Sequence, residues 1–176
     1  YTAITNLVSN AGVVATDTTG VGTVRNYIAA CGYGDDKGIF GFGNTGSYTA
    51  ITNLVSNAGV VATDTAGVGT VRNYPAACGY GGDKGIFGFG FASWPTLLSS
   101  TNLVSNAGVV ATDTTGVGTG RFDPGACEYG QDKGIFGFGN DGSVTAVTNL
   151  VSNAGVVATD VTGVGTARVA VAACSF

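Results

Sequence analysis

The chain has 176 residues, a formal net charge of −4 and only 10% charged residues, and it contains neither histidine nor methionine. This length suits one domain with a hydrophobic core, and the negative charge leaves no basic surface for nucleic acid. Without histidine, the commonest general base and neutral metal ligand are both missing, which argues against an enzyme. No run of about 18 apolar residues is present, so no membrane insertion is predicted.

The first 43 residues predict four short strands and no helix. Apolar residues do not recur at helical spacing, and glycine and β-branched residues are too frequent for a stable helix. Glycine, asparagine and aspartate between the apolar segments are typical of tight turns, and strands joined this closely run antiparallel. The predicted strands are Ala3–Val8, Val13–Asp17, Tyr27–Gly32 and Gly38–Phe42.

The same pattern then repeats along the chain. The segment Asn-Leu-Val-Ser-Asn-Ala-Gly-Val-Val-Ala-Thr-Asp begins at Asn6, Asn53, Asn102 and Asn149, at intervals of 47, 49 and 47 residues. We therefore predict a single repeat domain over residues 1–176, with repeats at about 1–47, 48–94, 95–143 and 144–176, the last incomplete. One four-stranded antiparallel sheet for each repeat of this length predicts an all-β, β-propeller-like array of about four blades. A solenoid is the competing interpretation.

A second segment shows that the chain is out of phase with its repeat. Gly-x-Asp-Lys-Gly-Ile-Phe-Gly-Phe-Gly occurs only three times, ending at Gly43, Gly90 and Gly139. Without an initiating methionine, the chain is expected to be a processed product or a fragment of a longer array. We predict that its first and last strands form one composite sheet or pair with another chain, because unpaired strand edges promote aggregation.

The two extra residues of the third repeat fall near residues 91–95. Insertions into repeats are tolerated in loops at one rim. Trp94, the only tryptophan, lies there and is the best candidate outside the repeat for a contact surface. A packing role for its side chain is the alternative.

Most charged residues recur once in each repeat. Catalytic sites need different residue types converging on one point, so this regularity indicates a scaffold and no catalytic residue is predicted. Each aspartate is expected to pair either with the arginine eight residues later or with one from the neighbouring repeat. A ring of ligand sites is the alternative. The predicted structural pairs come from Asp17, Arg25, Asp64, Arg72, Asp113, Arg121, Asp160 and Arg168.

The four cysteines also occur once in each repeat, at Cys31, Cys78, Cys127 and Cys174. Their spacing matches neither a zinc motif nor a local disulfide, so neither a metal nor a cofactor is predicted. Small buried apolar side chains are the expected role. If the strands converged on a common axis, four thiols would instead meet and bind a soft metal.

Tyrosines beside aspartates suggest shallow sugar sites, one for each repeat. An aromatic ring stacks on the apolar face of a sugar while a carboxylate accepts its hydroxyl groups. The alternative is that these tyrosines close the ends of the sheets. The candidate ligand-binding residues are Tyr33, Tyr80, Tyr129, Asp36, Asp83, Asp132 and Trp94.

Residues 25–43 resemble a kelch repeat, which has an arginine, a small apolar strand, a turn and an apolar strand ending in glycines. Here that strand ends in Gly-Phe-Gly rather than a Gly-Gly pair, and the usual tryptophan is missing. Propeller repeats of the chromosome-condensation-regulator type are similar around Gly-Tyr-Gly. The whole unit is also similar to tandem repeats in virion and tail-associated proteins of tailed bacteriophages.

These resemblances imply a non-enzymatic structural or adhesion component of an extracellular assembly, in particular a phage virion or tail accessory protein. Its partners would be copies of itself or other virion proteins, and its location extracellular or on the virion surface. A secreted lectin-like propeller that binds cell-surface glycan is the alternative, since repeated weak sites give avidity. An enzyme is a distant third.

Overall fold

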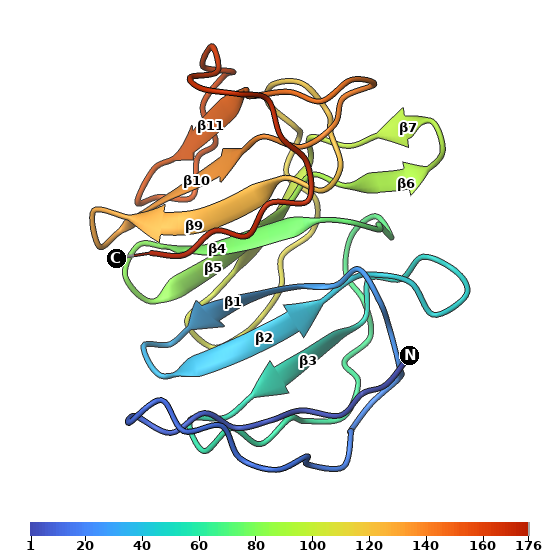
Figure 1. Cartoon of the computed structure of the whole chain (residues 1–176), viewed down its shortest axis with the longest axis vertical. Coiled ribbons are helices and arrows are strands. Elements are labelled where there is room, and N and C mark those ends of the chain that lie inside the picture. The colour runs from blue at the N-terminus through green and yellow to red at the C-terminus, as the bar shows by residue number, and fades with distance from the viewer. Residues whose placement is uncertain (176) are drawn as a thin grey trace.

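A computed structural model describes residues 1–175, which form eleven strands and no helix. The all-β class predicted from the sequence is therefore confirmed. Nine of the strands make three antiparallel sheets of three strands each, and the other two make a hairpin (Figure 1). Each sheet comes from one continuous stretch of chain, so the sheets succeed one another in sequence order.

The sheets share one topology, with the second strand in the middle. The first sheet contains β1 (Ala29–Tyr33), β2 (Lys37–Gly41) and β3 (Thr52–Val55). The second contains β4 (Ala76–Tyr80), β5 (Lys84–Gly88) and β8 (Thr101–Val104). The third contains β9 (Gly125–Tyr129), β10 (Lys133–Gly137) and β11 (Thr148–Val151). The hairpin of β6 (Phe91–Ser93) and β7 (Thr96–Leu97) interrupts the second repeat unit at the predicted insertion.

The sheets have three strands, not the predicted four, and they do not close on themselves. The segment after β3 is held only by isolated bridges, such as Thr52 to Thr65. Its ladder is interrupted because the side chain of Asn53, and not a backbone amide, donates to the Ala62 carbonyl at 3.1 Å. In the first repeat, the predicted strands Ala3–Val8 and Val13–Asp17 do not form, since residues 3–17 make isolated bridges only.

The sheets stack closely because glycines face their neighbours. Strand β4 lies beside both β1 and β9. A Cβ atom on Gly85 would lie 2.5 Å from Sγ of Cys31, and one on Gly134 would lie 2.7 Å from Sγ of Cys78. Only glycine permits such an approach between sheets.

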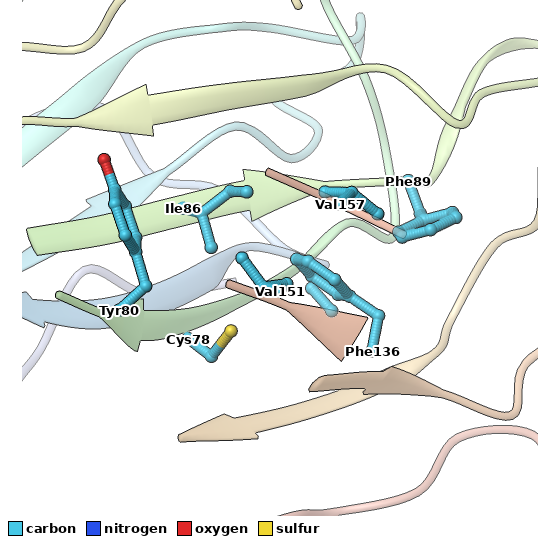
Figure 2. Packing of buried hydrophobic residues seen from close by; sticks show 8 residues of the cluster. Cys78, Tyr80, Ile86, Phe89, Phe136, Val151 and Val157 are labelled. Carbon is cyan, nitrogen blue, oxygen red and sulfur yellow. The ribbon is translucent and has the colours of Figure 1, made fainter. Parts of the chain in front are cut away.

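Apolar side chains fill the space between successive sheets. Figure 2 shows the cluster between the second and third sheets, where Cys78 and Tyr80 come from β4, Ile86 from β5 and Phe136 from β10. The rings of Phe89 and Phe136 lie 5.0 Å apart between centroids. An equivalent cluster joins the first two sheets. The core is therefore repeated along the stack and not centred on one point.

The two terminal segments pack on different sheets. Leu7 lies against Gly59 after the first sheet, whereas Val171 lies against Gly125 of the third. Figure 1 shows the N-terminal segment beyond β3 and the C-terminal segment along β9. Within residues 1–175 of one chain, the predicted composite sheet is thus not formed.

Candidate functional site

Polar clasps join each repeat to the next. In the first clasp, the Asp64 carboxylate accepts from the Thr23 amide at 3.0 and 3.1 Å and from the Thr23 hydroxyl at 2.5 Å. The Asn53 side chain donates to the same carboxylate at 2.8 Å, and Arg25 donates to the Asn53 side-chain oxygen. We use the word clasp for this set: a threonine and arginine from one repeat with an asparagine and aspartate from the next.

The second clasp contains a fully buried arginine. Arg72 Nη2 donates to Asn102 Oδ1 at 2.6 Å and to Asp113 Oδ1 at 3.1 Å, while Thr70 holds Asp113 through its amide and hydroxyl. The guanidinium also lies 4.9 Å from the centre of the Phe42 ring. A buried charge is tolerated here because every side of it has a polar or aromatic partner.

The third clasp repeats the threonine, asparagine and aspartate contacts. Thr119 donates to Asp160 through its hydroxyl at 2.6 Å, and Asn149 donates to it at 2.8 Å. Arg121 is buried beside them but turns its Nε to the Phe138 carbonyl at 2.8 Å. Among the clasp residues, the one arginine–aspartate ion pair, Arg72 with Asp113, therefore joins neighbouring repeats, which is one of the two arrangements expected from the sequence.

The clasps shift the pKa values of their charged groups. Hydrogen bonds from Thr23 and then Asn53 hold the pKa of Asp64 below its usual range. Burial pushes the pKa of Asp113 upward, but hydrogen bonds from Thr70 and Asn102 and the charge of Arg72 together outweigh it, and the net shift is downward. Burial lowers the pKa of Arg72 to about 10, partly offset by Asp113. Both members of the Arg72–Asp113 pair are thus charged at neutral pH.

The Gly-Val-Gly-Thr loop wraps the carboxylate of the next repeat. Its second glycine has φ of 83°, 84° and 79° at Gly22, Gly69 and Gly118. A Cβ atom at these positions would lie within 2.2–2.4 Å of the aspartate Oδ1. The recurring loop therefore serves contact between repeats.

The outermost charged residues are not clasped. Asp17 is exposed and accepts from the Asn6 side chain at 2.9 Å. Arg168 is exposed and stacks on the Phe138 ring at 4.2 Å. They belong to the two ends of the array.

The candidate sugar-binding aspartates form a polar rim. Asp36, Asp83 and Asp132 pair with the lysine that follows each of them, at 2.8, 2.6 and 2.7 Å. Each carboxylate also accepts a hydrogen bond from an asparagine side chain in the turn after the third strand of the same sheet. These carboxylates are already engaged in local contacts.

The candidate tyrosines lie between sheets. Tyr33 and Tyr80 are only 5% and 4% exposed, and Tyr129 is half-buried. Their rings pack against a glycine in the turn that follows the third strand of the next sheet, so Tyr33 covers Gly108 and Tyr80 covers Gly155. The faces of Tyr33 and Tyr80 are therefore covered, as in the alternative in which they close the sheet ends.

An aromatic surface surrounds the inserted hairpin. Its residues are Tyr27, Tyr74, Phe91, Trp94 and Phe122. The Trp94 side chain is 67% exposed and its ring lies 6.1 Å from that of Phe122, while Tyr27 and Tyr74 stack at 3.9 Å. Burial raises the pKa of the adjacent Asp123. Sequence reasoning singled out Trp94 alone, although the recurrence of Tyr27 at Tyr74, 47 residues later, was visible.

The four cysteines are free thiols distributed one to each sheet and one to the C-terminal segment. Burial raises the pKa of Cys31 to about 12, and it also raises the pKa of Cys78. Within residues 1–175, no group of three potential ligands among cysteine, aspartate and glutamate is placed to hold a metal. The thiols follow one another along the stack and do not converge.

No protein-family model matches this chain, and no curated protein sequence is significantly similar to it. In the part of the chain that the structure describes, no helix is long and apolar enough to cross a membrane.

Proposed function

We propose that this chain is a non-enzymatic structural or adhesion component of an extracellular assembly, specifically a phage virion or tail accessory protein. In this proposal its sheets act as the blades of a propeller-like array, with the bridged segment after each third strand serving as a fourth strand. The location on a particle or outside the cell is part of the same proposal.

The repeated clasp is the observation that supports this function most directly. Arg72 and Asp113 join neighbouring repeats in the second clasp, and Thr23 with Asp64 and Thr119 with Asp160 do so in the other two. A contact that joins unlike faces and recurs in the same geometry builds rigid, extendable arrays. Such an array suits a protein whose task is to present a surface or to span a distance.

Localisation in the native source tests the proposal. Particles from the source culture are separated on a density gradient and probed with an antibody against the chain, followed by immunogold electron microscopy. We expect the chain to sediment with particles and to remain after a high-salt wash. Recovery of the chain only in the soluble cell fraction would contradict the proposal.

Glycan binding at the aromatic surface is the second candidate function. The exposed indole of Trp94, beside Phe91 and Phe122, is suited to stack on the apolar face of a sugar. Asp123 follows Phe122 in sequence and supplies a carboxylate. This surface is single, so the proposal is one site for each chain, unlike the one site for each blade expected from the sequence.

A glycan array compares wild type with Trp94→Ala. We expect wild type to retain a defined set of glycans and Trp94→Ala to lose them. Val109→Ala, which truncates another exposed apolar residue, is the matched control and should bind as wild type does. Equal glycan binding by wild type and Trp94→Ala, or none by wild type, would reject this candidate.

A further inference from the structure

The two ends of the array carry the two halves of one clasp. At the N-terminal end, Asn6 donates to Asp17 at 2.9 Å and to the Ala15 carbonyl at 3.1 Å. Asn53 makes the same two contacts, to Asp64 at 2.8 Å and to Ala62 at 3.1 Å. The acceptor half is thus already in its clasped geometry, yet among residues 1–175 no threonine or arginine donates to Asp17.

The C-terminal end carries the donor half. Gly165, Thr166 and Arg168 correspond to Gly118, Thr119 and Arg121 of the previous repeat, and all three are exposed. Gly165 keeps the loop conformation, with φ of 87°. A Cβ atom on it would meet no described atom within 4 Å, whereas one on Gly118 would collide with Asp160. The loop therefore has an empty place where an aspartate sits in the other clasps.

The two ends of the chain are also complementary in an apolar contact. Between repeats, Gly155 packs under Leu103 and Tyr80. Leu150 and Tyr129 are the corresponding residues at the C-terminal end, where they line a hollow of about 340 Å³ and Leu150 is 40% exposed.

The matching glycine lies at the N-terminal end. Gly12 has φ of 74°, close to the 77° of Gly155, and no described atom lies within 4 Å of a Cβ placed on it. The turn at residues 9–13 has the same internal hydrogen bonds as the turns that fill this position between repeats, including Gly12 N to the Ser9 carbonyl at 2.9 Å. A turn of the right shape and a hollow of the right lining thus lie at opposite ends of the chain.

We propose that a second copy of this chain binds head to tail, with Thr166 and Arg168 of one copy clasping Asp17 and Asn6 of the next. The turn around Gly12 then enters the hollow beside Leu150. This inference rests on the proposed role as an assembly component and names the partner and the contact. The contact joins unlike faces, so it generates rings or filaments and not two-fold dimers.

The C-terminal segment forms part of this junction. Residues 171–175 already lie against β9 and continue the stack, with Val171 against Gly125. The contact joins two separate copies through one clasp and one apolar hollow, and we expect reversible association that rises with concentration.

Two complementary variants test the proposal. Asp17→Lys removes the acceptor half, and Thr166→Val combined with Arg168→Ala removes the donor half. By sedimentation velocity, wild type should form oligomers that grow with concentration, and each variant alone should lose all species above the monomer. A one-to-one mixture should form dimers and nothing larger, because only one intact junction is then possible.

The control is Asp35→Lys, an exposed charge reversal at a position where a later repeat has Gln131. It should associate as wild type does, and circular dichroism should show all variants folded. A wild type that is monomeric at every concentration, variants that still oligomerise, or a mixture that stays monomeric would overturn the proposal. If the chain associates with particles but forms no oligomers, the proposed function stands and the head-to-tail contact is rejected. If it forms oligomers but is never found on particles, the contact stands and the proposed function is rejected.

Discussion

Nη2 of Arg72 lies 3.1 Å from Oδ1 of Asp113, and the arginine side chain is fully buried while that of the aspartate is 30% exposed. The pair links two neighbouring repeats through residues that are 41 positions apart in sequence. The aspartate is the accessible partner, so it can be removed without opening the core. What remains is a buried cation whose other contacts are neutral.

Asp113→Ala should destabilise the protein by about 2–4 kcal/mol, because it leaves the Arg72 guanidinium buried without its counter-ion. Urea unfolding followed by circular dichroism measures the change. Asp17→Ala is the matched control, since Asp17 is exposed and accepts only from Asn6. At concentrations where the chain is monomeric it should cost less than about 0.5 kcal/mol. Equal losses for the two variants would show that the ion pair contributes little.

Gly118→Ala should destabilise the protein more than Gly165→Ala. Both residues have φ near +80°, at 79° and 87°, so the backbone strain of about 1 kcal/mol is shared. Only Gly118 has a carboxylate oxygen, that of Asp160, within 2.2 Å of the new methyl group. We expect an additional loss of about 1–3 kcal/mol at Gly118, the usual cost of overpacking. Thermal unfolding midpoints compare the two, and a lower midpoint for Gly165→Ala would contradict the assignment.

Acid should weaken the stack through the clasps. The pKa values of Asp64, Asp113 and Asp160 are lowered in the folded protein. A lowered folded-state pKa contributes stability that is complete above the unfolded value, about 3.9 for aspartate, and is lost as pH falls through the folded value. The free energy of unfolding should therefore fall below about pH 5.

The slope of that acid transition identifies its origin. Asp64→Asn should be less stable than wild type at neutral pH and should show a shallower decline on acidification, because one of the linked protons is then missing. Urea unfolding at a series of pH values measures both. A variant with the full wild-type slope would place the linkage elsewhere.

The cysteines should react in the order of their exposure. Burial raises the pKa of Cys31 to about 12 and keeps it protonated at neutral pH, and Cys78 is similarly protected. Cys174 is exposed. Since the thiolate is the reactive form, a thiol reagent should label Cys174 within minutes, the partly buried Cys31 much more slowly, and the buried Cys78 only on unfolding. Mass spectrometry of the digested protein identifies the sites, with Cys174→Ser as control.

The sequence predicted the strands whose contacts are local. The predicted strands Tyr27–Gly32 and Gly38–Phe42 lie close to β1 and β2, because glycine turns and β-branched residues determine a hairpin without help from distant parts of the chain. The predicted strands Ala3–Val8 and Val13–Asp17 formed only isolated bridges, and in the next repeat the Asn53 side chain takes the Ala62 carbonyl in place of a backbone amide. Asn6 makes the same contact to the Ala15 carbonyl at 3.1 Å, so this side-chain hydrogen bond is local, but hydropathy does not encode it.

The candidate site was harder to predict for the same reason. Tyr33 and Tyr80 suggested exposed rings, but they are covered by turns of the next sheet at Gly108 and Gly155, where the absence of a side chain makes room. Neither the partner aspartate of each arginine nor the grouping of Tyr74 with Phe122 follows from spacing, because both depend on how successive sheets are rotated and packed.

The hairpin of β6 and β7 distinguishes one repeat from the others in this nearly uniform chain. Tandem copies of one sequence can exchange places while folding, and such swaps trap multidomain and repeat proteins. Trp94 sits on the hairpin and meets Phe122, which stands where other repeats have Asn26 and Asn73. The two residues that depart from the repeat therefore contact each other. If the sheets packed in the wrong order, both rings would lose this contact.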